Sequence, residues 1–487
     1  MKIGVVLKVL GALFLVLAGF LAFPLLIAAA YDETSALAFG GSMLLTGGLG
    51  ALLLYLFRRC EADVGHREGF AVAALGWVGS CLLGALPFVF SGEPAFSSIT
   101  DCVFESTSGF TTTGASILTD IEAIPRGLLF WRSLTHWLGG MGIIALSVAL
   151  LPLLGVGGMQ LFRAEVPGPT ADKISPRVAE TARLLWTVYV GISALEALLL
   201  WLGGMSWFES LCHTFGTMAT GGFSTRNTSI AAYDSAYFDT VITIFMVAAG
   251  TNFALHYALL RRNWTAYFKD AEWRVYMTLF GGAMLALMLL TWLGGEYDSP
   301  WTALRYGAFQ SAAILTTTGY ATADFEAWGL VVPLAPMILF MFMFIGGCAG
   351  STGGGMKVGR VWLLAKLGAG ELYQLVHPRA VRPVKMNGRV VPPEVLRSIT
   401  RFFILFMGLF ALSVVAMSLL GLDFTTAISS VAASIGNIGP GLGNVGPTDN
   451  YGWVPMAGKW VLMLDMLLGR LEVYTILVLF VPELWRR

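Results

Sequence analysis

Long apolar stretches follow one another along almost the whole chain, separated by short polar segments. The hydrocarbon core of a bilayer is about 30 Å thick, so a helix needs about 20 apolar residues to cross it. Ten stretches of suitable length stand out: 3–30, 36–57, 70–90, 128–154, 184–203, 238–260, 275–294, 328–345, 402–420 and 454–480. The pattern predicts an all-α polytopic membrane protein with ten transmembrane helices.

Composition and charge agree with a membrane-embedded chain and add its orientation. The 487 residues are 56% hydrophobic and 12% charged, with a mean hydropathy of +0.73, which is too little charge for the surface of a soluble protein of this length. Of the 30 Lys and Arg, 24 fall on the two ends and on alternate loops, whereas loops at 31–35, 296–299 and 322–326 carry carboxylates. The positive-inside rule therefore predicts that both termini lie in the cytoplasm.

No pattern in the sequence indicates an enzyme or a resident cofactor. The five cysteines are scattered and the five histidines do not cluster, so neither a metal site nor a disulfide framework is expected. The chain contains neither His-Glu-x-x-His nor Gly-x-Ser-x-Gly, which are motifs of zinc peptidases and serine hydrolases. We expect no catalytic residue, no cofactor and no nucleic-acid partner.

A repeated segment divides the chain after its first two spans. Four stretches share an aromatic start, one short amphipathic run and a polar strip that contains Gly114, Gly222, Gly319 or Gly439; these glycines are 108, 97 and 120 residues apart. Each stretch lies between two apolar spans. The predicted organisation is an N-terminal helix pair (1–68), four pore repeats (69–155, 156–262, 263–376 and 397–487) and a cytoplasmic hairpin or linker (377–396).

The Thr/Gly strips favour an ion-binding role. Non-helical backbone at membrane depth is tolerated only where protein buries it or water surrounds it. Glycine permits positive φ, which lets successive carbonyls face one axis, and four such strips would replace the hydration shell of a monovalent cation with oxygens. The partly negative C-termini of the short helices also favour a cation. The alternative, that Gly and Thr only ease helix packing, accounts poorly for four aligned copies.

The four strips resemble the pore loops of the Trk/Ktr/HKT potassium transporters, and the two extra leading spans resemble the TrkH branch; the strips read TTTGAS, ATGGFST, TTTGYAT and NIGPGLG. The resemblance covers essentially the whole chain. It implies an inner-membrane homodimer that transports potassium and is served by a cytosolic nucleotide-binding regulator of the TrkA type. The filter residues that it implies, acting through backbone carbonyls, are Thr112, Thr113, Gly114, Thr220, Gly221, Gly222, Thr317, Thr318, Gly319, Asn437, Ile438 and Gly439.

The strips are not identical, which leaves two alternatives open. Gly221 replaces Thr in the second strip, Asn437 and Ile438 replace Thr-Thr in the fourth, and Pro440 follows Gly439. A ring with unlike quadrants should hold fewer ions in order than a symmetric potassium-channel filter. A weakly selective K⁺/Na⁺ transporter therefore stays possible, as does a proton- or sodium-coupled symporter. Carriers usually have inverted repeats, whereas these repeats are parallel.

A glycine-rich loop interrupts the span that begins at Trp328. The segment GGCAGSTGGG contains six glycines in ten residues, and each disfavours a helix by about 1 kcal/mol relative to alanine. Resemblance to TrkH-like proteins implies a gate beneath the filter; a passive broken helix is the alternative. The gate residues so implied are Gly346, Gly347, Gly350, Ser351, Thr352, Gly353, Gly354 and Gly355.

Arg470 lies about halfway along the last predicted span. A charge at that depth costs at least ~2.5–3.5 kcal/mol, so it should face the pore or a partner. Asp465 and Glu472 are not three or four residues away, the spacing that puts two side chains on one helix face. The family's arginine at this position implies that Arg470 belongs to the gate, as a barrier to ions below the filter. An ion pair with another helix is the alternative.

Several other polar residues have two possible roles. Three acidic residues of the first two pore helices either concentrate cations at the outer mouth or make structural hydrogen bonds: Asp101, Glu105 and Glu209. Three polar residues within spans are expected to pack or to form hydrogen bonds rather than relay protons: Glu196, Asn252 and His256.

Two further patterns predict local structure. Tryptophans near the predicted span ends fit an interfacial belt: Trp131, Trp207, Trp301 and Trp328. In the longest cytoplasmic loop, Asn387-Gly388 between short alternating runs predicts a β-hairpin within residues 377–391. This basic hairpin is either a dock for a soluble regulator or a cap with no partner.

Overall fold

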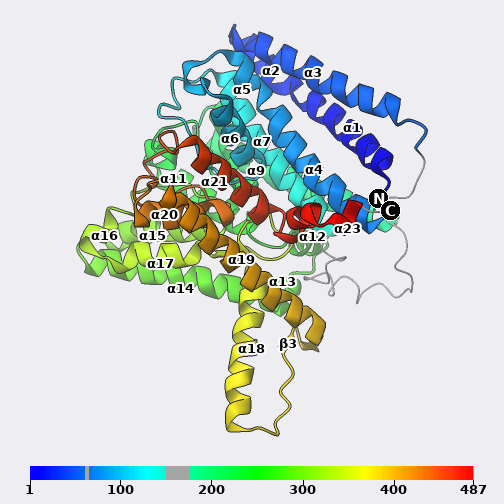
Figure 1. The fold of residues 1–487 in the computed structure, drawn as a ribbon. Coiled ribbons are helices and arrows are strands. Elements are labelled where there is room, and N and C mark those ends of the chain that lie inside the picture. The colour runs from blue at the N-terminus through cyan, green and yellow to red at the C-terminus, as the bar shows by residue number, and fades with distance from the viewer. Residues whose placement is uncertain (61–64, 150–175, 486–487) are drawn as a thin grey trace.

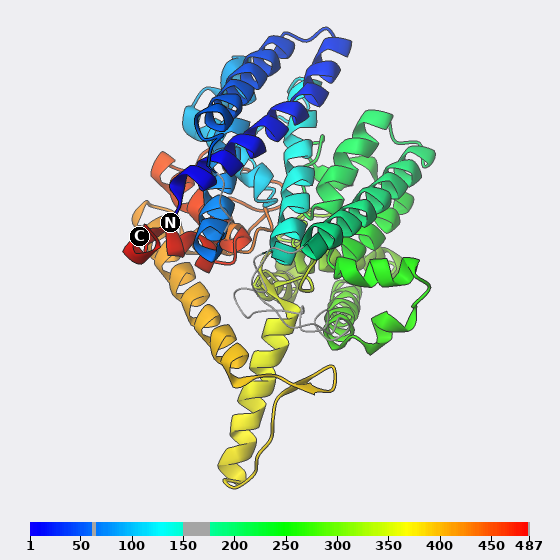
Figure 2. The same cartoon turned by 90° about the vertical axis from the view of Figure 1, so that its right-hand side faces the viewer.

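The computed structural model describes residues 1–60, 65–149 and 176–485, and helices dominate these ranges. Figure 1 shows a body of helices packed side by side, from which an arm formed by α18 (Val358–Val376) and a small hairpin extends. The two ends of the chain lie beside each other in both views (Figure 1, Figure 2). Leu479 near the C-terminus packs against a cluster that contains Val6 and Leu10, so the two terminal segments are in contact.

Parts of the sequence-based expectations lie outside the described residues. These are the end of the predicted span 128–154, the boundary between the first two repeats at residue 155, and four of the basic residues: Arg163, Lys173, Arg486 and Arg487.

The N-terminal helices form a layer against the rest of the body. α1 (Ile3–Phe20) continues into α2 (Ala22–Ala30), and α3 (Ser35–Leu56) runs back alongside them (Figure 1). The helices α1 and α3 approach closely where both carry glycine: a Cβ added to Gly11 would lie 2.9 Å from the carbonyl oxygen of Gly50. Small residues at a helix crossing allow this approach, on which association in a bilayer depends.

Four units of similar plan follow this layer. The first contains α4 (His66–Gly84), α5 (Leu86–Ser91), η1 (Pro94–Phe96), α6 (Ile99–Phe110) and α7 (Arg126–Ala149). The second contains α9 (Pro176–Leu202), α10 (Trp207–Met218), η2 (Ser229–Tyr233), α11 (Ala236–Ala249), α12 (Phe253–Leu260) and α13 (Thr265–Lys269). The third contains α14 (Ala271–Leu293), α15 (Pro300–Leu315), α16 (Trp328–Val331), α17 (Leu334–Phe342), β1 (Ile345–Gly346), β2 (Met356–Lys357) and α18. The fourth contains α19 (Pro393–Leu419), α20 (Phe424–Ile435), α21 (Met456–Arg470), α22 (Tyr474–Leu477), η3 (Val478–Phe480) and α23 (Pro482–Trp485).

Each unit has a short pore helix, and a side chain caps the N-terminus of each. The pore helices α6, α10 and α20 have 12 residues and α15 has 16, so at 1.5 Å per residue they are about 18 and 24 Å long, too short to cross the ~30 Å core of a bilayer. The capping residues accept a hydrogen bond from the backbone of the first turn: Ser98, Ser206, Ser299 and Asp423. A cap of this kind stabilises a helix by about 1 kcal/mol, and it fixes where each pore helix begins.

Three spans expected to be continuous are broken, which corrects the sequence-based expectation: 238–260, 454–480 and 328–345, where α16 ends at Val331 and α17 begins at Leu334. Within 238–260, α11 and α12 meet at an angle of 102°, because the carbonyl of Gly250 accepts from the amide of Cys348 at 2.8 Å and Asn252 starts a new helix by capping Ala254. Within 454–480, α21 ends at Arg470, and the next turn is reversed by positive φ at Glu472 and Val473 (56° and 57°).

Among the described residues, six helical stretches are long and apolar enough to cross a membrane, or seven if α11 and α12 count as one. They are the two of the N-terminal layer, the first helix of each unit and the bent pair. As far as the described residues extend, the second helices of the other units, α7, α17 and α21, do not qualify on length and composition. The arrangement of ten spans stays a prediction.

The predicted hairpin is present. β3 (Lys385–Met386) pairs antiparallel with β4 (Arg389–Val390), and the turn residues Asn387 and Gly388 both have positive φ, at 50° and 77°, as a type I′ turn requires. The side-chain oxygen of Asn387 accepts from the amide of Ala271 at 2.6 Å, so the turn is held against the start of α14.

The predicted tryptophan belt is half wrong. Trp207 and Trp301 are exposed on the surface of the chain, but Trp131 and Trp328 are buried. The indole of Trp131 donates to the carbonyl of Gly84 at 2.9 Å, and that of Trp328 donates to Tyr297. Both are therefore packing residues between helices, because each indole finds its polar partner inside the protein.

Candidate functional site

The four Thr/Gly strips share one backbone conformation, which begins where each pore helix ends. In each strip the third residue after the helix donates back to the carbonyl five residues earlier: Thr113 to Ser108, Gly221 to Gly216, Thr318 to Ala313 and Ile438 to Ala433, at 2.8–2.9 Å. The residue before it bonds to the carbonyl three residues earlier. This pair of bonds is a Schellman motif, which requires a left-handed residue after the helix.

The left-handed residues alternate with right-handed ones along each strip. The first left-handed residue is not glycine in any strip: Thr112, Thr220, Thr317 and Asn437 have φ of 53°, 54°, 62° and 54°. Two residues later come the aligned glycines Gly114, Gly222, Gly319 and Gly439, with φ of 77–100°. Alternation in the sign of φ turns successive carbonyls toward the same side of the chain, whereas a regular strand alternates them.

The strips lie around one another in a closed ring. A Cβ added to Gly114 would lie 2.0 Å from the carbonyl oxygen of Gly221, and one on Gly222 would lie 2.0 Å from that of Thr318. One on Gly319 would lie 1.8 Å from the oxygen of Ile438. One on Gly439 would lie 2.7 Å from the oxygen of Thr113. Each glycine thus faces the middle carbonyl of the next strip, and the fourth strip returns to the first.

Side chains tie neighbouring strips together. The amide of Asn437 donates to the hydroxyl of Thr113 at 3.0 Å and to the carbonyl of Met466 at 2.9 Å, so the residue that departs from the Thr pattern links the fourth strip to the first. The hydroxyl of Tyr320 donates to the carbonyl of Phe223 at 3.3 Å and joins the third strip to the second. The hydroxyl of Tyr451 donates to the carbonyl of Gly439 at 2.8 Å.

The loop of residues 346–355 lies against the C-terminal ends of three pore helices. Its ends are closed by the parallel pair β1–β2. The hydroxyl of Thr352 donates to the carbonyl of Met218 at 3.0 Å, and the amide of Gly354 donates to the hydroxyl of Thr317 at 2.6 Å. A Cβ on Gly354 would lie 2.4 Å from the carbonyl of Gly436. Glycine is needed there because backbone of the loop meets backbone of the fourth strip.

The same loop is anchored on its other side. The buried carboxylate of Glu272 in α14 accepts from the amides of Ala349 and Gly359, at 2.8 and 2.9 Å. The backbone of Phe253 donates to Gly350 at 3.1 Å. The ammonium of Lys357 donates to the carbonyl of Gly353. Backbone groups left free at the break between α11 and α12 are therefore hydrogen-bonded by the loop, and the loop's own backbone groups are hydrogen-bonded by residues at the break.

Arg470 connects this loop to the first unit. Its guanidinium donates to the carbonyl of Thr352 at 2.6 Å and to the carbonyl of Gly139 in α7 at 3.3 Å, and the side chain is 2% exposed. Within the part of the chain that the structure describes, no carboxylate pairs with it; the nearby Glu472 pairs with Arg360 instead. The gate residues expected from the sequence are thus brought together, and Arg470 binds carbonyls rather than an ion-pair partner.

The three acidic residues of the first two pore helices are all paired. Asp101 pairs with Lys459 at 2.6 Å, Glu105 with Arg132 at 2.5 Å and Glu209 with Arg226 at 2.8 Å. The Glu105 carboxylate also accepts from the amide of Ile117 at 3.0 Å. The geometry favours the structural alternative for these residues over free charges at the outer mouth.

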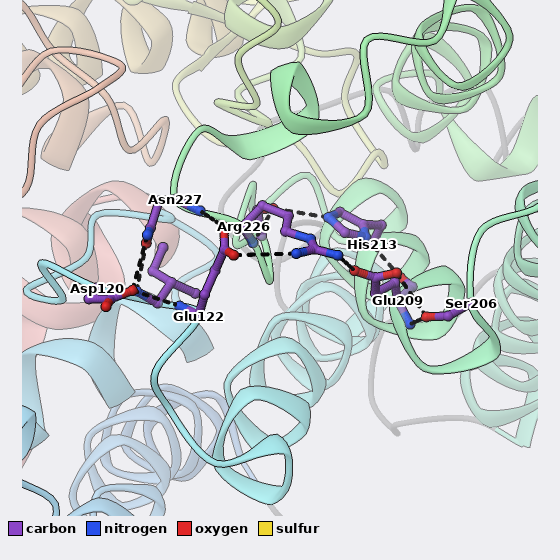
Figure 3. Close-up of polar contacts among 9 residues, drawn as sticks. Asp120, Glu122, Ser206, Glu209, His213, Arg226 and Asn227 are labelled. Atoms are coloured by element: carbon purple, nitrogen blue, oxygen red, sulfur yellow. Dashed lines mark hydrogen bonds and ion pairs between the residues drawn. The ribbon is translucent and has the colours of Figure 1, made fainter.

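Figure 3 shows how the loops that follow the first two strips are joined. The guanidinium of Arg226 lies between Glu122 at 3.3 Å and Glu209 at 2.8 Å. Beside it, Asn227 donates to Asp120 at 3.0 Å and accepts from the amide of Ile121 at 2.6 Å (Figure 3). The network holds the outer ends of the two strips in register.

All three polar residues predicted to pack or to form hydrogen bonds within spans do so, two through hydrogen bonds and Glu196 through burial. Asn252 caps α12 at 2.9 Å. His256 bonds the carbonyl of Ala248 at 2.9 Å and the hydroxyl of Tyr267 at 2.7 Å. Glu196 is fully buried, and neither carboxylate oxygen has a hydrogen-bond partner among the described residues.

Sequence reasoning missed Arg132 and His136, which lie one turn apart on α7 and both contact the second strip. The guanidinium of Arg132 donates to the carbonyl of Ser224 at 2.8 Å. A signal existed, because a charge and an imidazole four residues apart within a predicted span share one helix face and must be satisfied inside the protein.

Comparison with known proteins gives a consistent result. Residues 38–487 match the family model of TrkH, described as a cation transport protein. The chain is 42% identical over 481 residues to the Trk system potassium uptake protein TrkH of Salmonella typhimurium, covering 98% of both chains. It is 41% identical over 489 residues to TrkH of Halomonas elongata, covering 100% of both. The crystal structure of the potassium transporter TrkH from Vibrio parahaemolyticus superposes with a TM-score of 0.92 at 36% identity over 100% of both chains. This chain therefore belongs to the TrkH family of cation transport proteins.

Proposed function

We propose that this chain carries potassium into the cell through a pore whose narrow part is the ring of four strips. The observation that carries the proposal is the cyclic order of close approaches, in which the glycine of each strip faces the middle carbonyl of the next. Carbonyl oxygens arranged around one axis can replace the hydration shell of a monovalent cation. The relatives named as potassium uptake proteins make potassium the ion to test first.

The pore helices add to the attraction for a cation. Each of the four ends directly before its strip, so the partial negative charges of its terminal carbonyls converge on the region below the ring. The Schellman bonds that start each strip leave part of this carbonyl charge free to face an ion. A cation that leaves the ring therefore meets oxygen dipoles from four directions.

The loop 346–355 and Arg470 form the gate of this proposal. Backbone of the loop lies against three of the four pore-helix ends, and the guanidinium of Arg470 holds Thr352 there. A fixed positive charge beneath the ring repels a potassium ion, and a backbone segment across the path blocks it. Opening requires that the bond between Arg470 and Thr352 break and that the loop leave the ends of the pore helices.

The chain works as the membrane subunit of a larger system in the inner membrane, with both termini in the cytoplasm. The two terminal segments are in contact, as expected if an even number of spans brings the chain back to the side of the membrane on which it started. The end of α18 and the segment that follows it project from the body (Figure 2) and carry exposed apolar residues such as Leu375 and Val381. We assign this arm to the contacts with a second copy and with a cytosolic nucleotide-binding regulator.

The test is ion flux into liposomes that contain only the purified chain. Potassium, rubidium, sodium and choline are offered in turn, with no proton or sodium gradient imposed. A selective pore predicts uptake of potassium and rubidium well above sodium, and none of choline. Flux that appears only when a proton or sodium gradient is applied contradicts the pore and indicates a coupled symporter.

A matched pair of glycine variants separates the ring from backbone strain in general. Gly319 and Gly295 have similar φ, 77° and 83°, but a Cβ on Gly319 would lie 1.8 Å from the Ile438 carbonyl, whereas Gly295 has open space around it. Gly319→Ala should abolish potassium uptake and Gly295→Ala should preserve it. Equal uptake by the two variants would rule out the ring as the conducting part.

A further inference from the structure

The second strip lacks side chains that the first and third strips use to hold their shape. In the first strip the hydroxyls of Thr111 and Thr113 lie 2.8 Å apart, and in the third those of Thr316 and Thr318 lie 2.7 Å apart. The equivalent residues of the second strip are Ala219 and Gly221, so this hydroxyl pair is absent there.

The backbone of the second strip does not itself require glycine at residue 221. Gly222 has φ of 78°, but Gly221 is not among the residues at positive φ, and Thr113, Thr318 and Ile438 occupy the equivalent position elsewhere. The reason for glycine is steric. A Cβ on Gly221 would lie 2.3 Å from Nδ1 and 2.5 Å from Cγ of His136, so the imidazole occupies the missing side chain's place.

The imidazole is held in that place by stacking. The rings of His136 and Phe223 are stacked with centroids 4.1 Å apart and planes 14° apart. The guanidinium carbon of Arg132 lies 3.6 Å from the centroid of the Phe223 ring, and Glu105 fixes that guanidinium. Phe223 follows Gly222 directly, so α7 contacts both sides of the aligned glycine of the second strip, at residues 221 and 223.

Neither ring nitrogen of His136 has a hydrogen-bond partner among the described residues, although the side chain is fully buried. Burying an unsatisfied polar group is unfavourable. Within the described residues the ring is therefore held by its contacts with Phe223 and the second strip, and not by hydrogen bonds.

We infer that His136 is a positioning residue for the second quadrant of the filter: its imidazole takes the place of the side chain absent at Gly221, braces the strip from behind and thereby sets its discrimination between potassium and sodium. The inference rests on the proposed function of the ring. It predicts that residues 136 and 221 are complementary, so that a side chain can be added at 221 only if the ring at 136 is removed.

The experiment compares flux into liposomes for wild-type protein and five variants: Gly221→Ala, His136→Ala, the double variant of these two, Gly222→Ala, and Gly222→Ala combined with His136→Ala. Gly221→Ala should lower potassium uptake by roughly tenfold, because overpacking displaces the strip. Adding His136→Ala should restore most of that loss. It should not restore Gly222→Ala, because a Cβ there would meet the backbone oxygen of Thr318 at 2.0 Å.

A second readout separates positioning from stability alone. His136→Ala should lower the ratio of potassium to sodium uptake by about tenfold, which corresponds to about 1.4 kcal/mol, whereas His136→Phe, which keeps a ring in the space, should keep the ratio near that of wild type. If Gly221→Ala fails to fold, the yield of folded protein replaces flux as the readout, and His136→Ala should restore it.

Three results would overturn the inference: no recovery of Gly221→Ala by His136→Ala in flux or yield, equal recovery of Gly222→Ala, or an unchanged ratio of potassium to sodium uptake in His136→Ala. Any of them, with selective potassium uptake by the wild type, leaves the proposed function standing. Absence of potassium uptake by the wild type in the same liposomes contradicts the proposed function instead.

Discussion

The strips depend on residues in a conformation that is unfavourable for their type. Threonine is β-branched, and positive φ at such a residue is rare; a left-handed non-glycine residue costs of order 1–3 kcal/mol. Three of the four Schellman caps nevertheless use threonine at this position, namely Thr112, Thr220 and Thr317. Two backbone hydrogen bonds hold each of them there. The structure therefore stores backbone strain at the residue where each of these pore helices ends and its Thr/Gly strip begins.

Relief of this strain is measurable at Thr112, because its hydroxyl has no hydrogen-bond partner among the described residues. Thr112→Gly should raise the stability of the purified protein by about 1 kcal/mol, since glycine adopts positive φ freely. Thermal unfolding in detergent gives the measurement. The control is Thr113→Gly, at a residue without positive φ, which should lower stability. A destabilised Thr112→Gly protein would show that the left-handed turn is not strained.

Among the elements, the loop 346–355 and the broken helices α11–α12 and α21 are joined by hydrogen bonds. The loop takes hydrogen bonds that a continuous helix through residue 250 would use itself. Arg470, the last residue of α21, reaches across to the loop because the helix ends there. The break between α11 and α12 and the end of α21 are thus both stabilised by hydrogen bonds to the loop. Movement of the loop must therefore change the hydrogen bonds of both.

Removal of the arginine tests the proposed gate. Arg470→Ala should raise potassium flux by roughly tenfold or more, since a hydrogen bond to a charged group contributes about 1.5–3 kcal/mol and the charge that repels ions disappears with it. Arg470→Lys keeps the charge and should stay near the wild-type flux. Flux into liposomes at equal protein content is the measurement. Unchanged flux in a well-folded Arg470→Ala protein would exclude the barrier.

The N-terminus of the fourth pore helix should respond to acid. The Asp423 carboxylate accepts hydrogen bonds from the side chain and backbone of Thr426, and these lower its pKa below the ordinary value. Because the folded-state pKa is lowered, this stabilisation is present above the unfolded-state pKa, near 4, and is lost as the pH falls through the folded-state value.

Amide hydrogen exchange in the first turn of α20 is the measurement for Asp423. Corrected for the intrinsic pH dependence, exchange should speed up as the pH falls below about 4. In Asp423→Asn, which still caps the helix but does not titrate, exchange should not change with pH over this range. Equal pH dependence in both proteins would mean that another group is responsible.

Over the whole molecule, the four units are held together by side chains that contact more than one unit. Arg132 is the clearest case, because it bonds Glu105 in the first unit and the carbonyl of Ser224 in the second. Arg226 joins the outer loops of the same two units. The boundary between the first two units is therefore braced from α7 and from the loops that follow their strips.

The buried pair Arg132–Glu105 gives a prediction for the stability of this assembly. Removal of one partner leaves an unpaired buried charge and typically costs about 3–5 kcal/mol. Glu105→Gln and Arg132→Met should each lower the thermal stability strongly, and the double variant should lose clearly less than the sum. Strictly additive losses would show that the two side chains stabilise the protein independently.

The short helices and the strips that follow them could be predicted from the sequence, because residues close to each of them in the chain determine where they begin and end. Recurring glycines and capping residues set where each pore helix starts and ends, and Asn387-Gly388 set the hairpin. The broken helices could not be predicted from hydropathy, because the break at Gly250 is completed by a loop about one hundred residues later. The contact between His136 and Gly221 could not be predicted for the same reason, because the two residues are far apart in the sequence and meet only in the folded protein.

The location of the ion is the most direct test of a carbonyl-lined ring. Rubidium substitutes for potassium and can be located by its anomalous scattering in crystals of the purified protein. If the ring binds the transported ion, a rubidium peak should lie on its axis, among the carbonyl oxygens of Thr113, Gly221, Thr318 and Ile438, and should be lost when choline replaces rubidium. A rubidium peak elsewhere in the membrane body, with none in the ring, would contradict ion binding by the ring.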